Sequence, residues 1–310
     1  MNDWPGYFDC FATRIMTCGG SDVSVVADAI GRGHFQCRAA PKLYDAKLST
    51  WAKPFVAPVA SLQGMPLEER LYTLAKQTLL PLLEMVTGPF QVHWCLPREL
   101  TAALAHFYRG LPALFGCQAV FHPAEMGFTD IIKGLRPTKR DEIIILGSAM
   151  SYLENDCLQQ QLQQQTLMTA TNTEGLAPGE GAGFLAFKPV SNLDSKQSSS
   201  MRCIGKVNAE EFALLLQEKQ VQVLLPTYGC PTTVKAWHSV RRFCQRLSVN
   251  NTQVFMPALM SAKNQLGYLG VAAWPIALAL ARHMSQQQSQ PMLVCDAVDE
   301  TQFEVVYVCG

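Results

Sequence analysis

The chain has 310 residues, 48% of them apolar and 16% charged, so it can bury a large core and does not have the composition of a disordered protein. Its 25 basic and 25 acidic residues give a net charge of zero, which offers no electrostatic basis for binding nucleic acid or an anionic membrane. The N-terminus, MNDWPGYFDC, has no basic segment followed by an apolar one, and the best apolar run (270–281) is too short to span a bilayer. We therefore expect a cytoplasmic protein without a membrane span.

The cysteines and histidines follow no metal-binding or disulfide pattern. The 11 cysteines are scattered singly without a C-x-x-C pair, and the 6 histidines lack H-x-x-x-H spacing. With no secretory signal, reduced thiols fit best. The sequence thus predicts no metal site and no cofactor.

In chain order, the first half alternates amphipathic stretches with short apolar ones. The amphipathic stretches predict helices at 66–86 (with a possible kink at Pro81), 97–110, where Pro97 suits a first helical position, and 124–135. The apolar runs between them predict strands at 91–96, 117–121 and 142–146.

A polar, serine-rich stretch at 191–200 predicts a linker, after which the alternation starts again. The second half predicts helices at 209–220, 232–247 and 268–284, and strands at 202–207, 221–225, 252–256, 291–296 and 303–308. The glutamine-rich stretches 159–165 and 286–290 fit exposed helix or loop. This alternation predicts an α/β protein with mostly parallel sheets covered by helices, and two similar halves at residues 1–190 and 201–310.

Three glycines stand close together in APGEGAGFLAF, residues 177–187. A dinucleotide-binding turn needs G-x-G-x-x-G after a strand and before a helix, but here the spacing is G-x-G-x-G and a strand-like segment follows. The chain also has no Walker motif and no G-x-S-x-G motif. A phosphate-binding role for these glycines is therefore rejected.

The same segment resembles the GEGAG segment of β-ketoacyl synthases of the thiolase fold, whose glycines allow close backbone packing near the active site. A second match is KNQLGYLGVAAWPIALALA, where Lys263 and Gly267 are in register and Tyr268 stands at the family's histidine. A third is PTYGCPTT, where Gly229 and Pro231 match. In that segment Pro226 takes the place of the other histidine.

The family's nucleophilic cysteine opens the helix before the fourth strand. Counting back from EIIILGS, His122 falls at or beside that position, and Cys117 lies five residues earlier. The family's terminal glycine-rich loop has no counterpart in CDAVDETQFEVV. The resemblance covers nearly the whole chain and implies a thiolase-like, layered αβαβα fold with two pseudo-symmetric halves.

The resemblance also implies that condensation chemistry is lost. Condensation needs a thiolate and hydrogen-bond donors for the enolate oxygen, and His122, Pro226 and Tyr268 supply them poorly or not at all. The matched residues that remain form a retained cleft comprising Glu180, Gly181, Gly229, Lys263 and Gly267. Lys263 either binds an acyl thioester or another charged ligand, or pairs with a buried carboxylate such as Glu180; we favour the pair. His122 is more simply a hydrogen-bonded residue at a helix start.

Two classes of function remain open. In the first, the chain is a catalytically inactive binding subunit: a chain-length-factor-like partner of an active ketosynthase, or a scaffold or adaptor linked to secretion machinery. Such a subunit could engage an acyl carrier protein or a secreted client. In the second, it is an acyl-transferring enzyme with a relocated nucleophile, Cys117 or Cys230.

The resemblance implies an oligomer, because the third strand of the first half is a dimer edge in thiolase-fold proteins. Here that strand is uncharged and would expose Gln118, Ala119, Val120 and Phe121 for pairing with a copy of itself or with a ketosynthase. Alternatively, the apolar segment 51–62 covers this edge and the protein is monomeric.

Overall fold

A computed structural model describes residues 7–34, 36–40, 43–97, 101–123, 125–137, 142–173, 175–189, 200–219, 221–226, 231–248, 259–261 and 266–309. Its centre is one mixed sheet of ten strands. In chain order these are β1 (Tyr7–Met16), β6 (Phe90–Cys95), β7 (Ala119–His122), β8 (Ile143–Ser151), β9 (Glu180–Pro189), β10 (Ser200–Asn208), β11 (Gln222–Leu225), β12 (Leu259–Ser261), β13 (Met292–Ala297) and β14 (Gln302–Val308).

The two halves of this sheet share one strand order. Across the sheet the strands run β12-β11-β13-β14-β10-β1-β9-β8-β6-β7, so each half reads third, second, fourth, fifth, first from its outer edge to the centre. In each half the fifth strand is antiparallel to both neighbours, while the outer three are mutually parallel. The antiparallel pair β1–β10 joins the halves. Residues 191–199 of the expected linker lie outside the described residues and Ser200 already begins β10, while the boundaries at 190 and 201 stay a prediction.

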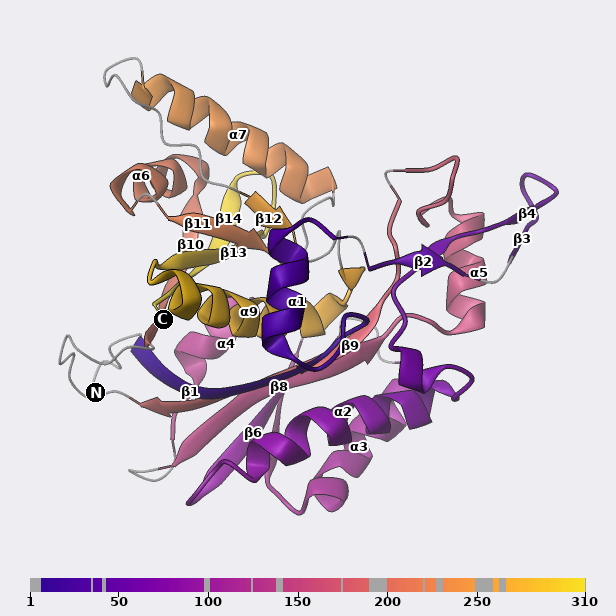
Figure 1. The fold of residues 1–310 in the computed structure, drawn as a ribbon, viewed down its shortest axis with the longest axis horizontal. Coiled ribbons are helices and arrows are strands. Elements are labelled where there is room, and N and C mark those ends of the chain that lie inside the picture. The colour runs from indigo at the N-terminus through magenta and orange to yellow at the C-terminus, as the bar shows by residue number, and fades with distance from the viewer. Residues whose placement is uncertain are drawn as a thin grey trace.

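Helices complete five layers, which confirms the layered α/β architecture (Figure 1). One outer layer is formed by α2 (Leu67–Leu83) and α3 (Ala102–Phe115), and the other by α6 (Ala209–Lys219) and α7 (Pro231–Ser248). Between the two half-sheets lie α1 (Val23–Gly31), α4 (Phe128–Gly134) and α9 (Ala273–Gln288).

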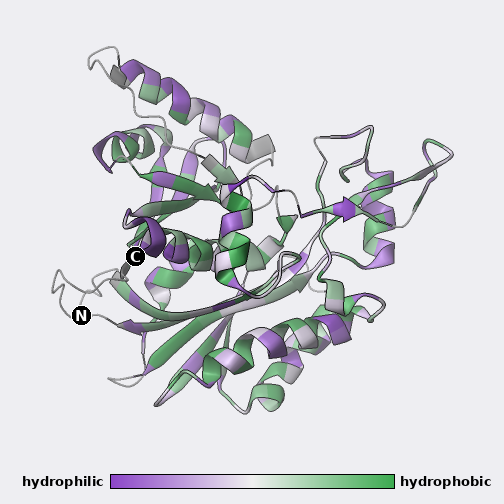
Figure 2. Ribbon diagram, viewed as in Figure 1, coloured by the Kyte–Doolittle hydropathy of each residue, from purple (hydrophilic) through white to green (hydrophobic). Residues whose placement is uncertain are grey.

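The middle layer explains the composition of α9. All nine residues from Ala273 to Ala281 are buried, because this helix contacts strands of both halves. A helix that is apolar on every side can exist in water only when it is enclosed in this way. Figure 2 shows the contrast with α7, whose outward face is hydrophilic.

The remaining elements are small. They are two short hairpin-like pairs, β2 (Arg38–Ala39) with β5 (Phe55–Val56) and β3 (Leu43–Asp45) with β4 (Thr50–Ala52), the single-turn helices η1 (Ala60–Leu62) and η2 (Gly270–Ala272), and α5 (Asn155–Gln163). The β3–β4 pair extends away from the body of the molecule (Figure 1). Within the described ranges, no helix is long and apolar enough to cross a membrane.

Several predicted boundaries were wrong. Helix α3 begins at Ala102 and not at Pro97, because the side chain of Thr101 accepts a hydrogen bond from Leu104 N–H and caps the helix there. The predicted helix 124–135 is only the seven-residue α4. Strand β8 continues to Ser151, well beyond 146, and all nine of its residues are buried. The glutamine-rich stretch 159–165 overlaps α5, and the predicted strand 252–256 lies outside the described residues.

Candidate functional site

The GEGAG segment is the beginning of a strand and not a loop, because β9 already starts at Glu180. Its glycines are required by close backbone approach. A Cβ on Gly181 would lie 2.8 Å from the carbonyl oxygen of Met16, and one on Gly183 would lie 2.9 Å from the backbone nitrogen of Ile276. Backbone atoms cannot yield as a flexible side chain can, so only glycine fits at these positions.

This segment packs against Gly267 and Tyr268, which precede η2 and so lie outside the helix predicted from residue 268. The N–H of Gly179 donates to the carbonyl of Tyr268 (3.1 Å), and the N–H of Tyr268 donates to the carbonyl of Ala177 (2.7 Å). Gly267 has φ +79°, and a Cβ there would lie 2.7 Å from the Cβ of Ala57. Gly229 lies outside the described residues, so its place in the retained cleft stays a prediction.

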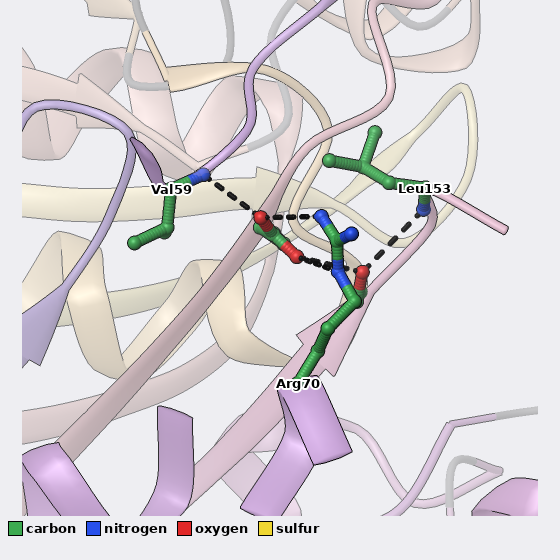
Figure 3. Close-up of polar contacts among 5 residues, drawn as sticks. Val59, Arg70 and Leu153 are labelled. Carbon is green, nitrogen blue, oxygen red and sulfur yellow. Dashed lines mark hydrogen bonds and ion pairs between the residues drawn. The ribbon is translucent and has the colours of Figure 1, made fainter. Parts of the chain in front are cut away.

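Glu180 is fully buried and is held by four hydrogen bonds (Figure 3). Arg70 donates to it twice, from Nε and Nη2, at 2.8 Å each. The backbone N–H of Val59 (2.8 Å) and the hydroxyl of Ser151 (2.9 Å) complete the set. Four donors match the acceptor capacity of one carboxylate. The cation that neutralises Glu180 is therefore Arg70, where the sequence suggested Lys263, which lies outside the described residues.

A cavity of about 370 Å³ opens beside this framework, in the middle layer between the half-sheets. It lies at the carboxyl ends of the parallel strands β6, β7 and β13, the edge at which open α/β sheets bind ligands. Its walls combine small and apolar residues with aromatic and polar side chains, among them His122, Tyr152, Tyr268, Trp274 and Glu304.

Two aromatic ring contacts, one stacked and one tilted, line this cavity. Trp274 and Phe128 stack with centroids 4.9 Å apart, and Tyr152 and Tyr268 lie 5.1 Å apart at 45°. Burial and the neighbouring Tyr268 raise the pKa of Tyr152. Gly270 has φ +53°, and a Cβ there would lie 2.3 Å from the hydroxyl of Tyr152. Tyr268 thus stands in the cavity wall as part of a tyrosine pair.

His122 is the last residue of β7, and it does not start a helix as the sequence suggested. Its Nε2 lies 2.8 Å from Nδ1 of His93 on the adjacent strand β6, so one ring donates to the other. Burial first, and His122 second, lower the pKa of His93 to about 4. Burial also lowers the pKa of His122. At neutral pH the pair is uncharged.

The N-terminus of α4 is occupied by a carboxylate of the other half. Glu304, on β14, accepts hydrogen bonds from the N–H of Phe128 (3.0 Å) and the hydroxyl of Thr129 (2.9 Å). A Cβ on Gly127, the cap residue, would lie 1.9 Å from Glu304 Oε1, so the glycine admits this carboxylate. Burial raises the pKa of Glu304, and these hydrogen bonds oppose that shift.

The thiols show no activated nucleophile among the described residues. Cys95 lines the cavity, but it is buried and its pKa is raised to about 12 by burial alone. Cys117 precedes β7, does not line the cavity, and has a pKa raised by burial. Cys230 lies outside the described residues. Within the described ranges, no group of three potential metal ligands occurs.

The remaining predicted positions lie elsewhere. Pro226 is buried just after β11 and does not line the cavity. β7 is the outermost strand of its half-sheet, and in the described part of the chain it pairs with β6 alone. The described hydrogen bonds of segment 51–62 run to residues 38–40 and 43–45 and to Met168, Pro178 and Glu180, and β7 is not among these partners.

Three residues of the site were not identified from the sequence: Arg70, Tyr152 and Glu304. Each reaches its partner across a large sequence separation, 110 residues for Arg70 with Glu180 and 176 for Glu304 with Phe128. A charged residue in an amphipathic helix or an alternating strand gives no local signal of such a contact. The apolar periodicity of α2 did give one indication that Arg70 is buried, because Arg70 falls on the same helix face as Leu71 and Leu74, which are buried.

No family model and no curated protein matches this sequence. Solved structures do match. The ishigamide ketosynthase/chain length factor has a TM-score of 0.61 and 14% identity, covering 98% of this chain and 99% of its own. A type II acyl-carrier protein–ketosynthase complex, AntDE:AntF, gives 0.68 and 10% over 99% and 100%. A β-ketoacyl synthase from Burkholderia phymatum gives 0.62 and 11% over 98% and 100%. The chain therefore has the thiolase-like fold of ketosynthases and chain length factors.

Proposed function

We propose that this chain is a catalytically inactive, β-ketoacyl synthase-like binding subunit that acts in the cytoplasm as a chain-length-factor-like partner of an active ketosynthase. The observation that carries the proposal is the carboxylate of Glu304 at the N-terminus of α4. The resemblance places the family's nucleophilic thiol at the start of the helix before the fourth strand. That helix is α4, which begins at Phe128, six residues beyond the position of His122 given by counting along the sequence.

At that position the chemistry is unfavourable for a thiolate. A helix N-terminus stabilises an anion through its free N–H groups, and Glu304 already takes the N–H of Phe128. A second anion beside this carboxylate would be repelled, which raises a thiol pKa. The sequence has no cysteine between Cys117 and Cys157, so no thiol stands there.

The hydrogen-bond donors that would stabilise the enolate oxygen are also altered. Condensation needs two donors aimed at the enolate oxygen, and loss of one such donor costs roughly 100- to 1,000-fold in rate. Tyr268 keeps one hydroxyl, paired with Tyr152, while Pro226 has no N–H and stands away from the cavity. Both observations favour binding over catalysis.

A partner surface is offered by the edge of β7. Its outer side bears no described strand, its side chains are uncharged, and Phe121 is 37% exposed. An unguarded apolar edge favours pairing with another chain. We propose a two-fold or pseudo-two-fold dimer through this strand, with a ketosynthase or with a second copy.

The catalytic part is tested by incubating the purified chain with malonyl- and acyl-carrier thioesters. We expect no release of carbon dioxide above the buffer background. Release that is abolished by Cys117→Ala or Cys230→Ala would overturn the proposal in favour of a relocated nucleophile.

The partner part is tested by light scattering of the chain alone and with a ketosynthase encoded beside it. We expect a dimer that Val120→Lys converts to monomers, with unchanged circular dichroism. Leu214→Lys on α6, an exposed leucine on another face, is the matched control and should stay dimeric. A wild-type monomer that ignores the ketosynthase would contradict the subunit role and favour the adaptor role, whose client could be an acyl carrier protein or a secreted protein.

A further inference from the structure

A second recess lies on another part of the molecule and shares no lining residue with the cavity at Tyr268. Its volume is about 490 Å³, and it is bounded by β1, the start of α1, the end of α2 and the last turns of α9. Figure 1 shows α1 lying across α9 beside β1, which brings these segments together. Three basic side chains line it: Arg14, Arg282 and His283.

Two of these side chains have buried nitrogens with no hydrogen-bond partner among the described residues. They are Nε of Arg282 and Nε2 of His283. A different nitrogen of Arg282, Nη2, donates a long hydrogen bond of 3.5 Å to the carbonyl of Phe11. Leaving a buried polar group unpaired costs about 1–3 kcal/mol, and more for a charged group. Buried polar groups are hydrogen-bonded in the great majority of cases, so this pair beside the recess calls for an explanation.

The charge of the recess favours an anion. Arg14 is half-buried and uses one nitrogen, Nη1, to donate to the carbonyl of Thr13 at 3.1 Å. Asp22 is the one carboxylate that lines the recess in the described structure, and it is engaged by the N–H and hydroxyl of Ser24 at 2.8 and 2.7 Å. Two guanidinium groups therefore face one carboxylate that is already hydrogen-bonded locally.

We propose that this recess binds a phosphate monoester, held by Arg14 and Arg282 with His283 as a further hydrogen-bond partner. A guanidinium presents paired N–H donors that fit phosphate oxygens, and two of them match a dianion. The volume admits the phosphate together with a small organic group. Thr13, Ser21 and Ser24 add hydroxyl groups to the wall. The GEGAG segment takes no part in this site.

The phosphate could be carried by a soluble metabolite or by a lipid headgroup, and two arms separate these sources. In one, the full chain is titrated calorimetrically with glycerol 3-phosphate and with inorganic phosphate, with chloride holding the ionic strength constant. In the other, it is sedimented with phosphatidylcholine vesicles with and without phosphatidic acid. We expect saturable binding in at least one arm.

Variants assign the binding to the recess. Arg14→Gln and Arg282→Gln should each raise the Kd at least tenfold, the loss expected for one charge-assisted hydrogen bond. Arg32→Gln removes an equal charge at a 69% exposed side chain outside the recess and should leave the Kd unchanged. Arg14 is half-buried, so Arg14→Gln should fold. This variant therefore still tests the recess if Arg282→Gln unfolds. Absence of binding in both arms, or equal Kd values in Arg14→Gln and the wild type, would overturn the proposal.

Discussion

The carboxylate of Glu180 and the guanidinium of Arg70 form a two-point ion pair in which the glutamate side chain is fully buried and the arginine side chain is 11% exposed. The pair ties α2 to the first residue of β9, and Val59 and Ser151 bring two further segments to the same carboxylate. Four segments of the first half thus meet at the carboxylate of Glu180.

Removing the cation alone should be costly. We expect Arg70→Met to lower the free energy of unfolding by about 3–5 kcal/mol, because it leaves a buried carboxylate without its counter-charge. Urea denaturation followed by circular dichroism measures this. Asp130→Asn breaks the surface pair with Lys206, whose side chains are 44% and 39% exposed, and should cost less than about 1 kcal/mol. Equal losses in the two variants would contradict the importance given to the buried pair.

The close contact between β8 and β9 makes a second prediction. A Cβ on Gly147 would lie 2.2 Å from the carbonyl oxygen of Gly183 and 2.2 Å from the ring of Phe184. Gly147→Ala should therefore destabilise the protein by about 1–3 kcal/mol or more, since both strands must separate.

The matched control is Gly31→Ala at the end of α1, where an added Cβ would meet nothing within 4 Å and φ is not positive. That variant should be neutral or should stabilise the protein by up to about 1 kcal/mol, because alanine favours helix and restricts the unfolded chain. Thermal unfolding compares the two. A stabilising Gly147→Ala would show that the strands are more widely spaced than described.

The fold could be anticipated from the sequence because its signals are local. The continuous small apolar residues of α9 indicate an enclosed helix, and the glycines at 179, 181 and 183 indicate close backbone approach. The site could not be anticipated to the same extent. The contacts of Glu304 with α4 and of Arg70 with Glu180 join distant segments, and they depend on how the two half-sheets face each other. His122 shows the same limit, since it ends β7 through backbone pairing with β6, a contact with a segment 27 residues earlier at Cys95.

The buried thiols give a prediction about chemical reactivity. Burial raises the pKa of the buried Cys10, Cys95 and Cys203, and of the half-buried Cys18 and Cys37, to about 12 from 9.0. This lowers the thiolate fraction at neutral pH by about a thousandfold. We expect iodoacetamide at pH 7.5 to leave Cys95 unmodified in the folded protein and to modify it fully in urea, as read by peptide mass mapping.

This labelling also bears on the proposed function. Rapid modification of Cys95 or Cys117 in the folded state would contradict the absence of an activated thiol in the cavity. Cys157 serves as an internal reference, because it is half-buried on the short outer helix α5 and has no part in the proposed site.

The His93–His122 pair should make stability depend on pH. The pKa of His93 is lowered from 6.5 to about 4, so between these values the unfolded chain binds a proton that the folded chain does not. The contribution of this pair to the free energy of unfolding is therefore fully present above pH 6.5 and is lost as pH falls toward 4, and it amounts to roughly 3 kcal/mol at most.

The free energy of unfolding in urea, measured from pH 7.5 to 4, should fall less steeply in His93→Phe than in the wild type. The pKa of Glu304 is raised by burial in every variant alike, so the difference between variants reports the His93–His122 pair. His106→Gln, whose side chain is 64% exposed, should keep the wild-type slope. Equal slopes in His93→Phe and the wild type would show that the pair does not couple folding to protonation.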